Sequence, residues 1–349
     1  MAAPFSRRMF LQLTACSPAV RPLLAQIAGS SRRSSAVSLI SGPNRRQNIT
    51  QALEAIDREI APALRQRKSV VIKPNFVSTD NQLAASHVDA VHGILDYLEP
   101  RFRGPVFIAE SSAGDTMNAF ESFRYNRLVA ERRAQQVQLI DLNREARFQT
   151  ASVLDADLHA VPVRLAARLM DPEAFVIAAA IPKTHNAMVA TLSVKNMAMG
   201  APLHSAPQLF GQWNDKRIVH NGLRQTHVNL FLVAQALRPF WGAAVIDGYE
   251  GMEGNGPTGG TPVPARLAIA STDYIAADRV ALETMGIDPS WVGYLRFCAD
   301  LGIGQYDLSK IELLGAKMAD VKRKYRLHSD IQHQLEWMGP LPNPLTQIG

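Results

Sequence analysis

Cysteine, aromatic residues and long apolar runs are all scarce in this sequence, and each scarcity excludes a class of protein. Cys16 and Cys298 are the only cysteines among 349 residues, too few for a disulfide framework, a zinc ribbon or an iron–sulfur cluster held by this chain alone. No apolar run reaches the length of about eighteen residues that an ordinary transmembrane helix needs. Aromatic residues make up 7% of the chain and form no cluster with basic residues, which argues against a platform for single-stranded nucleic acid. The remaining composition, 47% hydrophobic and 19% charged, is that of a globular protein.

The net charge of +6 says little about partners, because it resides in the N-terminal segment. Residues 1–33 hold five arginines and no acidic residue. Removing these five from the 37 basic residues leaves 32, against 31 acidic residues in the rest of the chain. We therefore predict no nucleic-acid partner and no membrane partner for the body of the protein.

Residues 1–30 resemble a twin-arginine export signal. Arg7 and Arg8 stand in Ser6-Arg7-Arg8-Met9-Phe10-Leu11, and a moderately apolar stretch interrupted by Arg21 follows them. Such a segment is an address that the twin-arginine export machinery reads, and not an anchor. We therefore expect export to the periplasm by a route that generally carries proteins already folded, with any cofactor in place. The alternative is a disordered basic N-terminus of a cytoplasmic protein.

Cys16 gives the same segment a second interpretation. Leu13-Thr14-Ala15-Cys16 resembles a lipoprotein cleavage box, in which Cys16 would become the lipidated first residue. The apolar run before Cys16 is only about seven residues, at the short limit for the hydrophobic region of a signal. A chance cysteine inside the signal is therefore the favoured interpretation.

The rest of the chain divides into a linker, one large domain and a tail. Residues 31–50 are rich in Ser, Arg and Asn, which is typical of a linker. Residues 51–315 alternate short β-branched runs with helical spacings, which predicts a single α/β domain with a mainly parallel or mixed sheet and helices on both faces. A loop-rich central insertion is expected over residues 198–226. Residues 316–349 are expected to form a charged surface helix and a tail.

Polar residues gather just after the carboxyl ends of the predicted strands. Ligands bind at that edge of an open α/β sheet, because loops converge there and helix N-termini point towards it. A purely structural domain has little reason to bring charged residues from several strands to one edge. The residues concerned are Lys73, Asn75, Glu110, Ser111, Lys183, His185, Asp247 and Asp273.

Two neighbouring stretches, Pro182-Lys183-Thr184-His185 and Ser193-Val194-Lys195-Asn196, are the most informative. They place two lysines and a histidine close together among uncharged residues, and lysines are rarely buried unless they are paired. One interpretation is that Lys73, Lys183 and Lys195 form a cationic cup for a carboxylate or a phosphate. The other is that they are three solvated surface lysines, and the sequence does not separate the two.

Residues 247–260 form a glycine-rich segment that carries three acidic residues, Asp247, Glu250 and Glu253. Glycine lets backbone N–H groups approach a ligand closely, which makes Gly254 and Gly256 candidates for substrate binding. The segment lacks the ending of a Walker loop, and Pro257 and the missing helix distinguish it from a dinucleotide-binding turn. The acidic residues favour a hard-cation site; the alternative is a long flexible hairpin.

No local motif establishes a metal centre or a nucleophile. His185, His204, His220 and His227 fall in the centre of the chain, but neither H-E-x-x-H nor H-x-H occurs, so a metal site would need residues distant in sequence to converge. The G-x-S-x-G motif is absent too, which argues against a serine hydrolase. Cys298 is predicted to be a core residue.

An ordered series of motifs resembles the family named domain of unknown function 362. The motifs are Val71-Ile72-Lys73-Pro74-Asn75, Ala109-Glu110-Ser111, Ile181-Pro182-Lys183-Thr184-His185, Val194-Lys195-Asn196-Met197-Ala198-Met199-Gly200, His227-Val228-Asn229-Leu230, Asp247-Gly248, Gly254-Asn255-Gly256-Pro257, and Thr272-Asp273 with Ala277-Asp278. The resemblance implies an α/β domain and no established reaction. Some members carry an attached ferredoxin-like domain with Cys-x-x-Cys motifs. This sequence has none, so no iron–sulfur cluster is expected.

Two main hypotheses follow. The first is an exported enzyme that binds a small anionic substrate at the carboxyl edge of the sheet, with a divalent metal as an optional cofactor. Its candidate residues are His185, Lys183 and Glu110 for catalysis; Lys73, Asn75, Lys195, Asn196, His227, Gly254 and Gly256 for substrate; and Asp247, Asp273 and Asp278 for metal. His185 is the acid/base candidate because the unperturbed pKa of histidine lies near neutrality. The second hypothesis is a non-enzymatic periplasmic accessory protein that binds a metal or a redox partner, and a third is a fold kept for interaction only.

Overall fold

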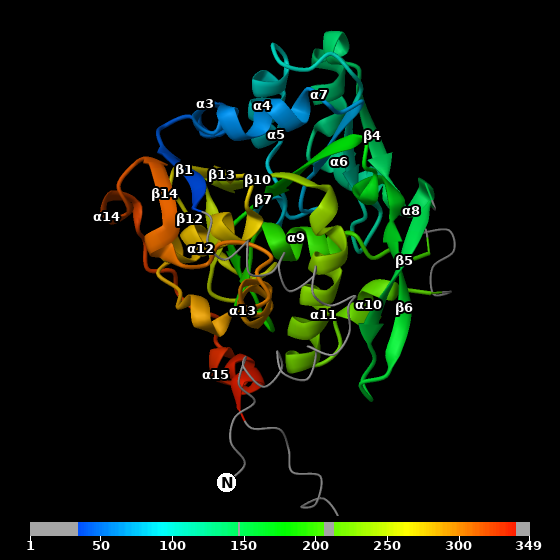
Figure 1. Cartoon of the computed structure of the whole chain (residues 1–349), viewed down its shortest axis with the longest axis vertical. Helices are drawn as coiled ribbons and strands as arrows, with labels where there is room; N and C mark the ends of the chain where they lie inside the picture. Colours follow the sequence, from blue (N-terminus) through cyan, green and yellow to red (C-terminus); the bar gives the residue numbers. More distant parts are fainter. Residues whose placement is uncertain (1–33, 146, 206–212, 340–349) are drawn as a thin grey trace, which may run out of the picture.

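The computed structural model describes residues 34–145, 147–205 and 213–339 (Figure 1). The export signal predicted for residues 1–30, with Cys16, lies outside the described residues, as do residues 340–349 of the predicted tail. Among the described residues, no helix has the length and apolarity to cross a membrane.

A mixed sheet of eight strands forms the centre of the described part of the chain. Its order is β14 (Ile311–Gly315), β1 (Ser35–Ser41), β13 (Leu267–Ser271), β10 (Trp241–Gly248), β7 (Ala174–Ala180), β2 (Ser69–Lys73), β3 (Val106–Glu110) and β4 (Val137–Asp141). Neighbouring strands from β10 to β4 pair in parallel. Strand β13 runs antiparallel to both of its neighbours, β10 and β1. The predicted α/β class with a mainly parallel or mixed sheet is confirmed.

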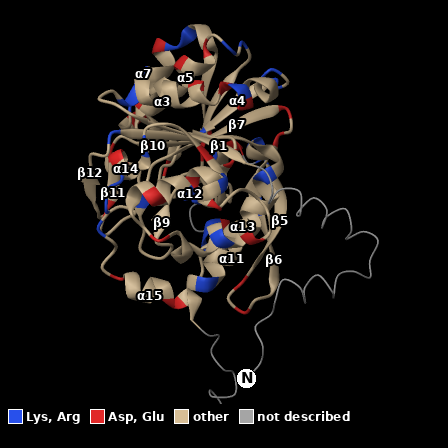
Figure 2. Ribbon diagram, turned by 60° about the vertical axis from the view of Figure 1, so that its left-hand side comes forward, with Lys and Arg blue, Asp and Glu red and all other residues tan. Residues whose placement is uncertain are grey.

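Helices cover both faces of this sheet (Figures 1 and 2). One layer consists of α3 (Arg45–Ala55), α4 (Asp57–Leu64), α5 (Val88–Leu98), α6 (Thr116–Ser122) and α7 (Tyr125–Glu131). The other contains α9 (Ser193–Gly200), α11 (Leu223–Leu237), α12 (Tyr274–Met285) and α13 (Gly293–Asp300). Within β2, Val70 and Ile72 pack in the apolar cluster that contains the α3–α7 layer, and Val71 packs in the cluster that contains the α9–α13 layer. Burial on both faces is why the parallel strands appear in the sequence as continuous apolar runs.

The prediction of a linker over residues 31–50 is wrong for the described part of that segment. Strand β1 lies between β13 and β14, with Val37 and Leu39 fully buried, and α3 begins at Arg45. The serines that suggested a linker are accommodated by hydrogen bonds, since the Ser38 hydroxyl donates to the Ala52 carbonyl at 2.7 Å. A serine that is bonded in this way can be buried in a strand.

The prediction of a charged surface helix within residues 316–349 is also wrong for the described part of that segment. Residues 316–339 form two short α-helices, α14 (Met318–Val321) and α15 (Ile331–Leu335), with non-helical chain between them, and a 3₁₀ helix, η8 (Glu336–Met338), follows α15. Tyr325 is buried there, and the amide of Arg326 donates to Glu253 at 2.9 Å. Contacts with the glycine-rich segment therefore replace the helix that the charge pattern indicated.

The glycine-rich segment is a hairpin, which was the alternative interpretation. Strands β11 (Gly251–Glu253) and β12 (Thr261–Val263) pair antiparallel, and β11 pairs with β8 (Lys183–Thr184) in a second sheet that ends at β9 (Ala190–Thr191). The Thr184 hydroxyl donates to the Gly254 carbonyl at 2.8 Å. A Cβ atom on Gly256 would overlap the carbonyl of Thr184. Glycine therefore allows two backbone segments to touch at this position.

Candidate functional site

The direction of β13 decides which polar residues reach the carboxyl edge of the parallel strands. Strands β2, β3, β7 and β10 all end at that edge. Ser271, at the end of β13, pairs instead with Ala244, whereas Leu267 at its beginning pairs with Gly248 at the end of β10. Asp273, which follows β13, therefore lies at the opposite edge. There it caps α12, with its carboxylate accepting from the amides of Ile275 and Ala276 at 3.0 and 3.1 Å.

The prediction of a metal site at Asp247, Asp273 and Asp278 is wrong, because these carboxylates have separate partners. Asp278 is buried in α12 and accepts from the amides of Ser193 and Val194, at 2.9 and 3.0 Å, where α9 begins. Burial raises the pKa of Asp278 to about 7. Asp247 lies 3.2 Å from Arg45 of α3, and burial raises the pKa of Asp247 to about 6.

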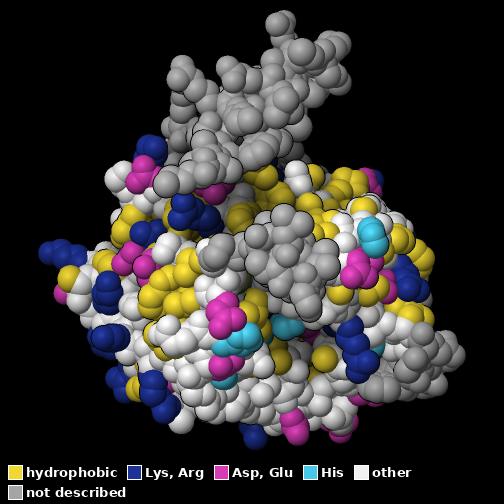
Figure 3. Space-filling view, turned by 90° about the horizontal axis from the view of Figure 1, so that it is seen from below, with side chains coloured by type: hydrophobic (Ala, Val, Ile, Leu, Met, Phe, Trp, Pro, Cys, Tyr) yellow, Lys and Arg dark blue, Asp and Glu magenta, His cyan; other side chains and the backbone are white. Residues whose placement is uncertain are grey.

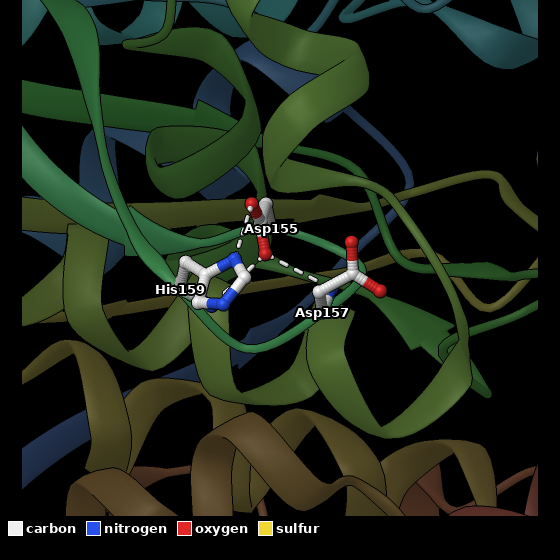
Figure 4. Close-up of side chains that lie close together, drawn as sticks. All are labelled: Asp155, Asp157 and His159. Carbon is white, nitrogen blue, oxygen red and sulfur yellow. Dashed lines mark hydrogen bonds and ion pairs between the residues drawn. The ribbon is translucent and has the colours of Figure 1, made fainter.

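Within the described ranges, the one group of three potential metal ligands that converges is Asp155, Asp157 and His159 (Figure 4). It occupies the turn between β5 (Phe148–Leu154) and β6 (Ala160–Ala166). The Asp155 carboxylate already accepts from the amides of Asp157 and His159, both at 2.9 Å. The hydrogen bonds of the turn account for this exposed group without a metal.

A buried ion pair joins the ends of β2 and β3. The Nζ atom of Lys73 lies 2.8 and 3.0 Å from the two carboxylate oxygens of Glu110, and both side chains are at most 3% exposed. Glu110 also accepts from the amides of Phe76 and Ser111, at 3.0 and 2.8 Å. Gly200 provides space for the Lys73 stem, which a Cβ atom at that position would overlap. Burial nevertheless lowers the pKa of Lys73, against the opposing effect of Glu110.

A chain of hydrogen bonds extends from this pair to Lys183. Lys73 donates to the Oδ1 atom of Asn196 at 3.0 Å, and Asn75 donates to the same oxygen at 3.2 Å. Lys183 then donates to the Oδ1 atom of Asn75 at 2.7 Å and to the carbonyl of Ala84 at 2.6 Å. Burial, with Lys195 nearby, lowers the pKa of Lys183 well below its usual value. Lys183 thus orients Asn75 and does not line the cavity described next.

A cavity of about 190 Å³ lies at this edge of the sheet. It brings together seven residues that the sequence pattern selected: Lys73, Asn75, Glu110, Ser111, His185, Lys195 and Asn196. It adjoins a second cavity of about 570 Å³, because Lys216 and His220 line both. On the molecular face shown in Figure 3, basic and acidic side chains of the described residues are interspersed. The four lysines at this edge, Lys73, Lys183, Lys195 and Lys216, are all buried.

The two remaining lysines of this cavity differ in their partners. Lys195, in α9, is buried and has no hydrogen-bond or ion-pair partner among the described residues. Burial lowers its pKa to about 8. Lys216, in α10 (Asp215–Val219), donates to the Ser111 hydroxyl at 2.8 Å and to the Met199 carbonyl at 2.9 Å, and burial lowers its pKa to about 7. The sequence analysis missed Lys216, which belongs to no motif and lies in a segment without periodicity.

The hydrogen bonds of His185 indicate which ring nitrogen carries the proton. Its Nδ1 atom accepts from the amides of Ala187 and Met188, at 3.0 and 3.2 Å, so the proton of the neutral ring is assigned to Nε2. Burial, followed by the charge of Lys195, lowers the pKa of His185 well below 6.5. The ring centroid of His220 lies 5.8 Å away, and burial lowers the pKa of His220 to about 4. His185 is therefore equipped to donate a hydrogen bond and is a poor base at neutral pH.

Three predicted substrate residues do not line the cavity. His227 packs against the rings of Tyr294 and Trp337, accepts from the amide of Tyr294 at 3.2 Å, and has its pKa lowered to about 3 by burial. Gly254 and Gly256 lie in the hairpin that packs on β8. His227, Gly254 and Gly256 therefore have packing roles, and the prediction that they bind substrate in this cavity is corrected.

The fold and the site define an α/β protein with a buried cluster of lysines at the carboxyl edge of its parallel strands. The chain belongs to the family described as "Domain of unknown function (DUF362)", which matches residues 70–283. A search of curated proteins finds no significant match.

Two solved structures show limited similarity to the chain. One is a protein from Thermotoga maritima, with 12% identity, a TM-score of 0.40, and coverage of 59% of this chain and 51% of that one. The other is the lactate racemase apoprotein from Thermoanaerobacterium thermosaccharolyticum, with 11% identity, a TM-score of 0.41, and coverage of 74% and 58%. The chain thus spans little more than half the length of either protein.

Replacing Glu110 by Gln removes the carboxylate from the buried ion pair and leaves the Lys73 charge without its partner. We expect a loss of about 3–5 kcal/mol in the free energy of unfolding, the usual cost of breaking a buried pair from one side. Urea denaturation measures it. Glu173→Gln is the matched control, since Glu173 pairs with Lys68 at 2.6 Å on the exposed surface and its loss should leave the stability unchanged. Equal stability of the two variants would contradict the structural role of the buried pair.

Proposed function

We propose that this protein is an enzyme that binds a small anionic substrate, a carboxylate or a phosphate, in the cavity of about 190 Å³. The observation that carries the proposal is an imbalance of buried charge. Lys73, Lys195 and Lys216 line the cavity, Lys183 lies behind it, and Glu110 is the one carboxylate in its described lining.

The lowered pKa values of these lysines support an anionic ligand. Burial is the largest cause for each of the four, so each ammonium group has lost more solvation than its partners restore. An anion in the cavity would offset this loss and raise the four pKa values. Lys195 has no partner among the described residues, so it is the cation most available to contact the ligand.

The cavity also supplies a neutral donor. The Nε2–H group assigned to His185 belongs to its lining. Charged and neutral donors in one desolvated site can stabilise negative charge that develops on a substrate oxygen. We propose Lys195 for anion binding, His185 as a hydrogen-bond donor, and Asn75 and Asn196 as positioning residues.

A divalent metal does not fit this site. Hard cations take several oxygen ligands, mainly carboxylates, and the oxygens of Glu110 already accept from Lys73, Phe76 and Ser111. The surrounding ammonium groups would repel a cation. The proposal therefore includes no metal at the cavity.

Sulfate binding tests the role of Lys195. Calorimetric titration of the Lys195→Gln variant should show an affinity for sulfate about ten- to hundredfold below that of the native protein, because one charge-assisted hydrogen bond contributes about 1.5–3 kcal/mol. Lys195→Arg should retain more of the affinity, because it keeps the charge. Lys310→Gln, at a half-exposed surface lysine, is the control that should bind as the native protein does. Unchanged affinity in Lys195→Gln would contradict the assignment, and tight binding with no turnover of any anion would favour the accessory-protein hypothesis.

The pH dependence of sulfate binding follows from the same groups. Sulfate keeps its charge between pH 6 and 9, whereas Lys216 and Lys195 have pKa values of about 7 and about 8. Sulfate affinity should therefore be highest below pH 7 and fall as the pH rises through 7 and 8, because the ammonium forms are lost. In Lys195→Gln the part of this fall around pH 8 should disappear. An affinity that stays constant from pH 6 to pH 9 would contradict the assignment.

We also propose that the enzyme is exported by the twin-arginine route, from the pair Arg7-Arg8. Replacing both arginines by lysine should keep the protein in the cytoplasmic fraction, because the export machinery reads the arginine pair itself. Cell fractionation and immunoblotting measure this. An identical distribution of native and variant protein would favour the alternative of a basic cytoplasmic N-terminus. Metabolic labelling with palmitate, compared with Cys16→Ser, tests lipid anchoring in the same cells.

A further inference from the structure

Lys216 has an arrangement of hydrogen bonds that suits a neutral amine. Its Nζ atom lies 2.8 Å from the Ser111 hydroxyl and 2.9 Å from the Met199 carbonyl. The Ser111 hydroxyl donates its own proton to the Gly200 carbonyl at 2.5 Å, so towards Lys216 it acts as an acceptor. Both partners of Lys216 therefore take an N–H from it. A neutral amine has two N–H groups and one lone pair, and in this arrangement the lone pair is not used.

The other lysines of the network lack this arrangement. Lys73 donates to both oxygens of a carboxylate, to an amide oxygen and to a carbonyl, which requires the ammonium form. Lys183 also has two acceptors, but it does not line the cavity. Lys195 has no acceptor among the described residues to hold its amine in one orientation. Among the lysines that line the cavity, Lys216 is the one whose two acceptors, the Ser111 hydroxyl and the Met199 carbonyl, are both neutral oxygens that a neutral amine can satisfy.

The environment of Lys216 keeps a nucleophilic fraction available. Burial lowers its pKa to about 7, with the charge of Lys73 acting in the same direction and those of Glu110 and Asp141 acting against it. This shift favours the neutral amine relative to a solvated lysine. Desolvation beside other cationic groups is an established way to activate a lysine for attack on a carbonyl.

We propose that Lys216 is a nucleophile that forms an imine with a small oxo acid, a substrate that carries a carbonyl group close to a carboxylate. This rests on the proposed function, since the carboxylate would be held by Lys195, and it narrows the substrate class. The carbonyl oxygen would accept from the Nε2–H group assigned to His185, which lines the same cavity.

The step balances without an oxidant, a reductant or a metal. The lone pair of the Lys216 nitrogen forms a bond to the carbonyl carbon, and the π electron pair moves to the oxygen. The nitrogen gives up its two protons, and the oxygen leaves with them as water when the C=N bond forms. Uptake of one further proton from solvent water by the imine restores one N–H, which can again donate to Ser111 or Met199. Because Ser111 directs its own proton to Gly200, it orients the amine and is not itself the attacking group.

Reductive trapping tests the proposal on the full-length protein. Native protein is incubated at pH 7 with pyruvate and sodium cyanoborohydride, and peptide mapping by mass spectrometry locates the reduced adduct. We expect one pyruvate adduct per chain, on Lys216, at a pyruvate concentration at least tenfold below that needed to label exposed lysines such as Lys68 and Lys310. Acetone, which has a carbonyl and no carboxylate, should label Lys216 only at much higher concentration.

Two variants and one binding measurement complete the test. Lys216→Arg should give no adduct at that position, and Lys195→Gln should require about ten times more pyruvate. No adduct on native protein, an adduct on Lys195, or labelling shared evenly among surface lysines would each overturn the proposal. Sulfate titration of the same preparation distinguishes a failure of the imine proposal from a failure of the proposed anion site. Retained sulfate binding without trapping rejects the imine alone, and loss of both rejects the anion site as well.

Discussion

The ion pair between Lys73 and Glu110 is the interaction on which the rest of the site depends. It lies at the ends of two adjacent parallel strands and is almost completely buried. Lys73 donates to Asn196 in α9, Asn75 donates to the same oxygen of Asn196, and Lys183 donates to Asn75. One carboxylate thus supports a network in which cations predominate. Such a network is costly to bury, and this cost is the physical reason for expecting an anionic ligand.

The antiparallel strand β13 divides the polar residues into two sets with different roles. Lys73, Asn75 and Glu110, at the ends of the parallel strands β2 and β3, line the cavity, whereas Asp273 follows β13 and caps α12 at the other edge. Asp278 acts on the site indirectly. Its buried carboxylate caps α9, the helix that carries Lys195 and Asn196. A residue selected as a metal ligand therefore holds the helix that lines the cavity.

Elements held by local patterns are predictable from the sequence, whereas features held by contacts between distant residues are not. Continuous apolar runs identified strands such as β2 and β7, because a strand buried on both faces has no polar alternation. The position of Lys73 and Glu110 after such runs was enough to select both. Strand β1 was taken for a linker, because its serines are satisfied by partners that sequence does not show, as Ser38 is by Ala52 and Ala270. Lys216 was missed for the same reason, since its partner Ser111 is 105 residues away.

The α/β class, the strand-end positions of the polar residues and the membership of the family are all readable from the amino-acid sequence alone. These properties depend on local pattern and on the order of motifs. Tertiary structure alone decided that β13 runs antiparallel, that Lys183 lies behind the cavity, and that Lys216 joins Lys195 in its lining. Strand direction and side-chain burial arise from pairings between residues that are distant in the sequence. Desolvation lowers the pKa of a buried lysine relative to a solvated one, and it exists only after those pairings have formed.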